Sequence, residues 1–212
     1  MAPIVSSEQI SEFREQGVTV LRGVFFDWVN VLRNGVDANM ADPDPNARIY
    51  TGKDGGGRFF VDYCNWARIP EYKEFIFNSN AAAIGAELMD SKKVQLFHEH
   101  VLVKEAATGV PTPWHQDAPY YCVDSAKTVS LWIPLDDVPR ETTPEFISGS
   151  QKWDKFYRPQ RFDGSALNEY DGLEDIPDIN GHREDYDILG WAVGPGDAIA
   201  FDYRTIHGAP AN

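Results

Sequence analysis

The segment from Pro111 to Tyr121, PTPWHQDAPYY, places an imidazole and a carboxylate one residue apart, at His115 and Asp117. In an extended chain, residues i and i+2 point to the same face, so both side chains are able to reach one small object. Imidazole and carboxylate groups are ordinary ligands of transition metals. A His-x-Asp pair also occurs on many protein surfaces, so a metal site requires a further ligand elsewhere in the chain.

His207 is the strongest candidate for that third ligand. It lies in FDYRTIHGAP, directly after a predicted strand, and is followed by the small residue Gly208. Two histidines and one carboxylate on one face of a metal leave three positions open on non-haem Fe(II), as an oxygenase requires. The other interpretation is that His207 only ends a strand and that His115 and Asp117 form a surface pair.

The remaining histidines differ in their setting. His98 and His100 are two residues apart in a predicted strand and therefore share a face. His182 lies in an acidic segment and is expected at the surface.

The first third of the chain, which must support this site, is predicted to be mainly helical. Ser6 and Gln9 fit a capping box, with Gly17 at the C-terminal end of the same helix. Asp27 is expected to cap a second helix, and the Pro- and Gly-rich stretch 42–58 is expected to form a loop. The predicted helices are 6–17, 27–40, 70–79 and 80–91.

Beyond residue 90 the sequence changes to short runs typical of strands, separated by turn signals such as the Pro-Gly-Asp at 195–197. Helices followed by irregularly spaced antiparallel strands indicate an α+β, mainly β protein, for which a double-sheet jelly roll is the expected architecture. The predicted strands lie within 18–25, 92–105, 127–138, 144–149 and 196–203.

The length of 212 residues suits a single domain over residues 1–212. We expect a helical part at about 1–90 and a jelly-roll core at about 91–212. Residues 154–190 form a long, acidic and weakly patterned segment, which is typical of a disordered region or of a functional lid.

Composition excludes several classes of protein. A net charge of −14, without a cluster of Lys and Arg, disfavours binding to nucleic acid. No apolar run is long enough to span a membrane, and the N-terminus lacks a signal-peptide pattern. The only cysteines, Cys64 and Cys122, provide no disulfide framework, which suits a cytoplasmic protein. GKDGGGR lacks the phosphate-binding loop pattern and is interpreted as a flexible loop.

Three stretches together resemble the phytanoyl-CoA dioxygenase family: TPWHQDAPYYCVDSAKTVSLWIPLDDVPRE, EFISGSQKW and PGDAIAFDYRTIHGAP. The resemblance runs from about Arg58 to the end of the chain, and more loosely over the N-terminal helices. It implies an Fe(II)- and 2-oxoglutarate-dependent oxygenase on a double-stranded β-helix, a cupin-like jelly roll, with O₂ as a further co-substrate. It also implies that the last barrel strand, with an arginine for the far carboxylate of 2-oxoglutarate, lies beyond Asn212.

The resemblance assigns the metal ligands to His115, Asp117 and His207. Trp132 corresponds to the family's tryptophan beside 2-oxoglutarate, although a plain core aromatic is the alternative. Arg58 corresponds to a basic residue that helps to hold 2-oxoglutarate in some relatives and is often a lysine.

His100 corresponds to a residue that lines the co-substrate pocket in relatives. Strand alternation in TVSLWIPL agrees with the assignment of Trp132, because it places Thr128, Ser130 and Trp132 on one face.

The activity implied by the resemblance is hydroxylation of an unactivated C–H bond of a small-molecule substrate, with release of succinate and CO₂. Related halogenases have a small residue in place of the carboxylate, so Asp117 favours hydroxylation. Two alternatives remain: a zinc hydrolase that uses the same three ligands, and a jelly-roll module that stacks a sugar on Trp114, Tyr120 and Tyr121 without metal chemistry. The sequence does not identify the substrate or an obligate protein partner.

Overall fold

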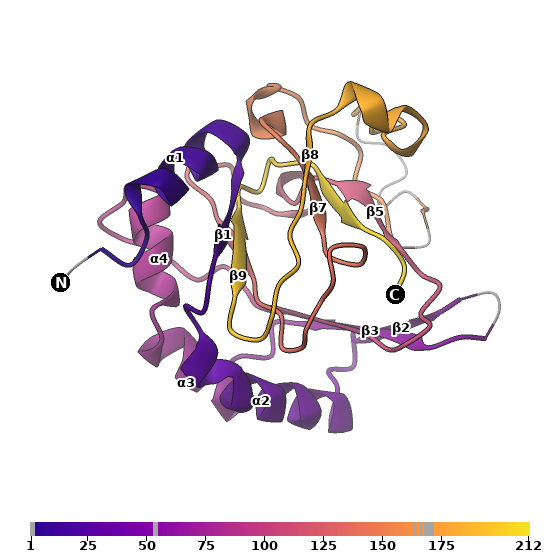
Figure 1. Cartoon of the computed structure of the whole chain (residues 1–212). Helices are drawn as coiled ribbons and strands as arrows, with labels where there is room; N and C mark the ends of the chain where they lie inside the picture. The colour runs from indigo at the N-terminus through magenta and orange to yellow at the C-terminus, as the bar shows by residue number, and fades with distance from the viewer. Residues whose placement is uncertain (1–2, 53–54, 163, 166, 168–171) are drawn as a thin grey trace.

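Figure 1 shows the computed structural model of the chain, which describes residues 3–52, 55–162, 164–165, 167 and 172–212. The α-helices are α1 Ser7–Gln16, α2 Val29–Ala41, α3 Pro70–Asn78 and α4 Ala81–Leu88, and the 3-10 turns are η1 Phe26–Trp28, η2 Ala118–Tyr120, η3 Ser150–Lys152 and η4 Asn180–Asp185. The strands are β1 Val18–Leu21, β2 Arg48–Thr51, β3 Arg58–Tyr63, β4 His100–Lys104, β5 Thr112–His115, β6 Ser130–Trp132, β7 Glu145–Ile147, β8 Ile188–Leu189, β9 Ala198–Phe201 and β10 His207–Ala209.

The described strands form three antiparallel sheets, in the orders β1-β9-β6, β5-β10-β7-β8 and β2-β3-β4. A buried cluster that includes Ile199 and Phe201 of β9 and Phe146 of β7 joins the first two sheets. This arrangement confirms the expected α+β, mainly β fold with a jelly-roll core. β1 lies within the predicted strand 18–25 of the otherwise largely helical N-terminal part, and it pairs with β9 of the core.

Helices cover the outer faces of two sheets, as Figure 1 shows for α1 and α4 beside β1. The alternation in β6 follows the prediction. Leu131 packs on the helical side with Val129 and Ile133, whereas Trp132 packs into the cluster between the sheets. Strand alternation therefore separates the residues of β6 that support the fold from those that face its interior.

α1 has the predicted boundaries and caps. Ser6 and Gln9 form the reciprocal capping box, and Gly17 ends the helix with φ 81°, a left-handed conformation that favours glycine. A side chain at Gly17 would also collide with Gln151 and Thr205, since a Cβ there would lie only 2.5 Å from the Gln151 side chain.

Three local predictions were wrong. Asp27 lies inside η1 and makes no capping bond, and α2 begins after it at Val29. Part of the predicted loop is β2, which forms a ladder with β3, a pairing that has no local signal in the sequence. Most strands are shorter than predicted; β6 stops two residues before Pro134, whose ring nitrogen has no hydrogen to donate to a ladder.

The two expected loops are only partly described. Residues 53–54 of the predicted Gly-rich loop, and residues 163, 166 and 168–171 of the 154–190 segment, lie outside the described residues. Elsewhere the long segment contains η4, β8 and a bridge between Tyr157 and Glu174. Among the described helices, none combines the length and the apolar character needed to cross a membrane.

A buried carboxylate fastens α2 to the sheet of β2, β3 and β4. Asp62 is 1% exposed and accepts hydrogen bonds from Asn39 Nδ2 at 2.7 Å and from the Asp44 N–H at 3.0 Å. Burial alone would raise the pKa of Asp62, but these and neighbouring hydrogen bonds outweigh it and hold the pKa below its usual value.

Asp62→Asn should therefore reduce stability at neutral pH and flatten the acid limb of the stability profile. A carboxylate with a lowered folded-state pKa stabilises the protein above the unfolded pKa, about 3.9, and loses that contribution as pH falls through the folded pKa. Urea unfolding between neutral pH and about pH 3 measures the effect. The exposed residue Asp37, also on α2, supplies the control Asp37→Asn. A profile for Asp62→Asn parallel to that of the wild type would contradict the prediction.

Candidate metal centre

Strand register places the two predicted histidine ligands opposite each other. In the antiparallel pair of β5 and β10, His207 faces His115 directly, so both side chains point to the same side of the sheet. Their ring centroids are 4.2 Å apart. Gly208 permits the close approach of the strands, because a Cβ there would lie 3.1–3.3 Å from the backbone of Thr112 and Trp114.

Asp117 reaches the histidines by a different route from the one predicted. It does not share an extended strand with His115, because β5 ends at His115 and Asp117 has helical angles, φ −70° and ψ −38°, at the start of η2. The turn brings the carboxylate back toward the imidazoles. Ser130 of β6 fixes it there, since the Ser130 hydroxyl donates to Asp117 Oδ2 at 3.0 Å.

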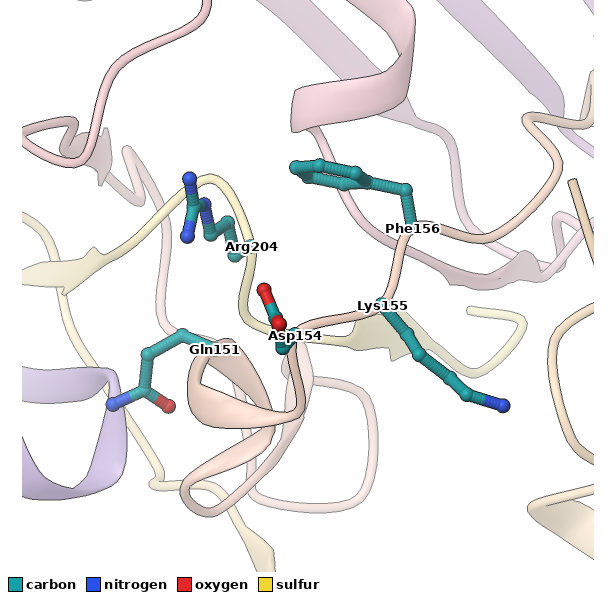
Figure 2. A pocket seen from close by; sticks show the side chains of 5 residues that line it. All are labelled: Gln151, Asp154, Lys155, Phe156 and Arg204. Atoms are coloured by element: carbon teal, nitrogen blue, oxygen red, sulfur yellow. The ribbon is translucent and has the colours of Figure 1, made fainter.

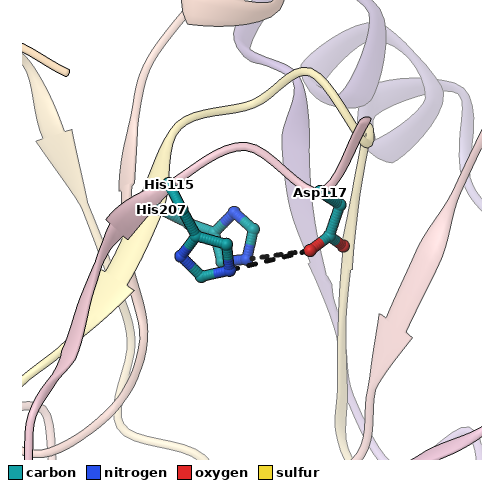
Figure 3. Close-up of side chains that lie close together, drawn as sticks. All are labelled: His115, Asp117 and His207. Atoms are coloured by element: carbon teal, nitrogen blue, oxygen red, sulfur yellow. Dashed lines mark ion pairs between the residues drawn. The ribbon is translucent and has the colours of Figure 1, made fainter. Parts of the chain in front are cut away.

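The three side chains converge, as Figure 3 shows. Asp117 Oδ1 lies 3.7 Å from His115 Nε2 and 3.8 Å from His207 Nε2. These separations are too long for hydrogen bonds but are spans that an ion between the atoms would bridge. One ligand atom from each residue lies within 4.8 Å of the other two, and all three side chains are largely buried.

The hydrogen bonds of the two imidazoles suit a metal. Nδ1 of His115 lies 2.8 Å from the Pro113 carbonyl, and Nδ1 of His207 lies 2.9 Å from the Thr205 carbonyl. A carbonyl only accepts, so each Nδ1 carries the hydrogen and each Nε2 keeps its lone pair for a ligand. Burial lowers the pKa of His207 to about 4, which keeps that imidazole neutral. The donor set therefore fits a divalent transition metal.

Aromatic side chains hold His207 in place. Its ring stacks on Phe146 of β7 at 5.7 Å with an interplanar angle of 19°, and lies 4.5 Å from the ring of Phe201. His207 is only 8% exposed. The packing restricts the imidazole to one orientation and shields the inner side of the site from water.

Two of the other predicted site residues face the same side of the protein as the three ligands. Trp132 shares its strand face with Ser130, which binds Asp117. His100 interacts electrostatically with both His115 and Asp117. Loss of hydration lowers the pKa of His100 to about 4 although the residue is partly open to solvent.

The structure does not bring Arg58 to this side. It shares a face of β3 with Phe60 and Asp62, and those residues pack toward α2 and α3. Its guanidinium is more than half exposed and forms an ion pair with Glu105. The neighbouring residue, Phe59, belongs to the opposite face of the same strand.

Lys104 lies on that opposite face, at a position that no sequence motif marks. It stands opposite Phe59 in the β3–β4 ladder, and its ammonium lies 5.1 Å from the centre of the Phe59 ring. The Lys104 Nζ donates to the Pro210 carbonyl at 3.0 Å, three residues after His207. Burial lowers the pKa of Lys104 to about 8. Strand alternation along β4 was the signal that could have found it, because Lys104 is four residues after His100 and therefore shares its face.

The residues of the sugar-stacking alternative are engaged within the protein. Trp114 donates from Nε1 to Asn180 Oδ1 at 3.0 Å. The Tyr120 hydroxyl donates to the Gln160 carbonyl at 2.6 Å and accepts from the Gln160 N–H at 2.8 Å. Tyr121 instead belongs to a ring cluster with Phe97 and His98, whose centroids lie 5.0 Å from its own.

Comparison with known proteins gives a family and a fold. The family model described as phytanoyl-CoA dioxygenase (PhyH) matches residues 13–212. No curated protein sequence matches the chain.

Among solved structures, the α-ketoglutarate-dependent carbocyclase SnoK from nogalamycin biosynthesis is 21% identical with a TM-score of 0.77, covering 98% of this chain and 78% of its own. EctD from S. alaskensis, solved with 2-oxoglutarate and 5-hydroxyectoine, is 20% identical with a TM-score of 0.74, covering 100% of this chain and 72% of its own. The epimerase SnoN, in complex with Fe³⁺, α-ketoglutarate and nogalamycin RO, is 19% identical with a TM-score of 0.72, covering 97% of this chain and 77% of its own.

Proposed function

The chain belongs to the phytanoyl-CoA dioxygenase family of Fe(II)- and 2-oxoglutarate-dependent oxygenases, and we propose that it hydroxylates an unactivated C–H bond of a small molecule. The observation that carries the proposal is the convergence of two imidazole Nε2 atoms and one carboxylate oxygen on a single point. This ligand set leaves positions on a metal open for a co-substrate and O₂. Succinate and CO₂ are the expected co-products.

Bound iron, together with O₂ and 2-oxoglutarate, would supply the oxidising power. The protein's contribution is to hold and orient. His115 and His207 present neutral nitrogens whose orientation is set by backbone carbonyls. Asp117 supplies the negative charge, and the Ser130 hydroxyl fixes which carboxylate oxygen faces the histidines. Phe146 and Phe201 keep water from the inner side of the site.

Hydroxylation is one of several outcomes that this ligand set supports, because the structural relatives include an epimerase and a carbocyclase. Retention of the carboxylate at Asp117 supports oxygen transfer over halogenation. Turnover under ¹⁸O₂ separates the outcomes: a hydroxylated product carries the label, whereas an epimerised or cyclised product does not. An unlabelled product that is formed together with succinate would refute hydroxylation. The assignment to the 2-oxoglutarate-dependent oxygenases would still hold.

Ring-bearing side chains form a contiguous cluster that includes His100. Tyr63 and His100 face each other across the β3–β4 ladder with ring centroids 5.8 Å apart, and Tyr121 packs beside His98. Tyr63 is 45% exposed. We propose that these rings contact the substrate, which favours a small molecule with an apolar or planar face. Screening such compounds for stimulated succinate formation tests this proposal.

The cation that binds 2-oxoglutarate is proposed to be Lys104, with Arg58 as the alternative that the sequence suggested. Lys104→Met should raise the 2-oxoglutarate concentration for half-maximal rate by about tenfold to a hundredfold, because a charge-assisted hydrogen bond contributes roughly 1.5–3 kcal/mol. Arg58→Ala should change it by less than about threefold, since its guanidinium is exposed and paired with Glu105. Steady-state succinate assays measure both values.

The two variants serve as each other's control. A large shift for Arg58→Ala and none for Lys104→Met would return the role to Arg58. Equal, small shifts for both variants would exclude both residues as the main anchor of the co-substrate.

A further inference from the structure

Gln116 lies between His115 and Asp117 in the chain, yet its side chain forms its hydrogen bonds with the backbone of other segments. It is 2% exposed, and all of its hydrogen-bonding groups are used. Its Nε2 donates to the Lys155 carbonyl at 3.1 Å and to the Arg204 carbonyl at 2.9 Å, and its Oε1 accepts from the Tyr157 N–H at 3.1 Å.

These three bonds join segments that are distant in the sequence. One is the turn at 115–117, which carries two of the ligands. The second is the segment 155–157, and the third is the loop 202–206, which leads into the third ligand, His207. The loop and the turn have one further backbone link, from the Ala118 N–H to the Tyr203 carbonyl at 2.9 Å.

The loop contact bears directly on the third ligand. Arg204 is followed by Thr205, whose carbonyl lies 2.9 Å from His207 Nδ1 and sets the direction of that imidazole. A displacement of the Arg204 carbonyl would therefore move the group that orients His207. On the other side, Gln116 is joined by peptide bonds directly to His115 and Asp117, so a shift of its amide would be transmitted to both residues.

We propose that Gln116 is a positioning residue that sets the spacing of His115 and Asp117 relative to His207. This inference rests on the proposed metal site. The role requires a primary amide. Two backbone carbonyls need two N–H donors, and one backbone N–H needs an acceptor. Glutamate at this position would retain the acceptor but lose the donors, and methionine would keep the length of the side chain without either function.

Gln151 offers a matched control. Its Nε2 also donates to two backbone carbonyls, those of Arg14 at 3.2 Å and Glu15 at 3.4 Å, both of which belong to α1. Figure 2 shows Gln151 lining the same small cavity as Lys155 and Arg204. Gln151→Met therefore removes a similar pair of bonds in the same region without loosening the turn at 115–117.

The test measures Co(II) binding to metal-free protein by its visible absorption, together with the thermal midpoint of each metal-free variant. Gln116→Met and Gln116→Glu should bind Co(II) about tenfold to a hundredfold more weakly than the wild type, as is typical when a group that orients metal ligands is lost. The absorption band should also change shape, because the ligand geometry changes. Gln151→Met should bind Co(II) as the wild type does, even if its thermal midpoint falls.

Several results would overturn the inference. Wild-type Co(II) affinity and spectrum in a folded Gln116→Met or Gln116→Glu variant would show that the amide only stabilises the fold. An equal loss of affinity in Gln151→Met would lead to the same conclusion. Failure of the wild type itself to bind Co(II) would instead contradict the proposed metal site, so the two failures are distinguishable.

Discussion

Asp117→Ala should abolish iron-dependent succinate formation while the fold survives. Asp117 supplies the only carboxylate among the three convergent ligands. Loss of a residue that merely orients a ligand costs about 10–100-fold in metal affinity or activity, so loss of the ligand itself should exceed about 100-fold. The side chain lies at the edge of the core, 14% exposed, and its removal leaves the packing of Phe146 and Phe201 untouched.

The measurement is succinate formation by metal-stripped protein that has been restored with Fe(II), alongside circular dichroism to verify folding. Asp124→Ala is a suitable control, because Asp124 is an exposed carboxylate seven residues further along the chain. Wild-type turnover by Asp117→Ala would remove this residue from the ligand set. A loss of only a few-fold would assign it to an indirect role.

Metal binding should raise the thermal stability of the metal-free protein by about 5–11 °C. A ligand that binds only the folded state contributes ~2.7 kcal/mol when its free concentration is about 100 times Kd. In a protein of this length, each kcal/mol moves the midpoint by about 2–4 °C. His115→Ala should abolish the gain, because only two of the three convergent ligands would remain.

Co(II) is a convenient metal for this experiment, which differential scanning fluorimetry can follow. His182→Ala provides the control: His182 is exposed within η4 and is not one of the convergent ligands. It should retain the full gain. An undiminished gain in His115→Ala would place the stabilising metal elsewhere.

The convergence of His115, Asp117 and His207 was predictable because its signal lies in residue type and local motif. A histidine and an aspartate one residue apart, with a histidine at the end of a later strand, specify the same donor set whatever the details of the backbone. The backbone path that brings Asp117 to the two histidines was less predictable. Asp117 reaches the site through a turn rather than along a strand, because β5 ends at His115 and η2 begins after Asp117.

Arg58 and Lys104 show where the sequence was insufficient. A strand presents alternate residues to opposite faces, so an error of one residue in register moves a side chain from the interior to the outside. The β2–β3 ladder, which fixes that register, lies partly in a stretch that reads as a loop. The family resemblance, matched there by charge and not by residue identity, selected Arg58, whereas the ladder places Lys104 on the face that carries His100.

Gln116 and Ser130 show a second limit. Their significance comes from partners that are far away in the sequence. Ser130 binds a carboxylate 13 residues before it, and the carbonyls bound by Gln116 lie 39 and 88 residues after it. No periodicity or local motif reports such contacts, because only the folded chain creates them.

Anaerobic titration of the metal-free protein with Fe(II) in the presence of 2-oxoglutarate tests the central claim most directly. We predict that a visible charge-transfer band develops and saturates at a single equivalent of iron per chain, that it requires 2-oxoglutarate, and that it is absent from Asp117→Ala. A zinc hydrolase or a sugar-binding module would show no such band. A folded wild-type protein without the band, or an equal band in Asp117→Ala, would contradict the assignment of iron and 2-oxoglutarate to His115, Asp117 and His207.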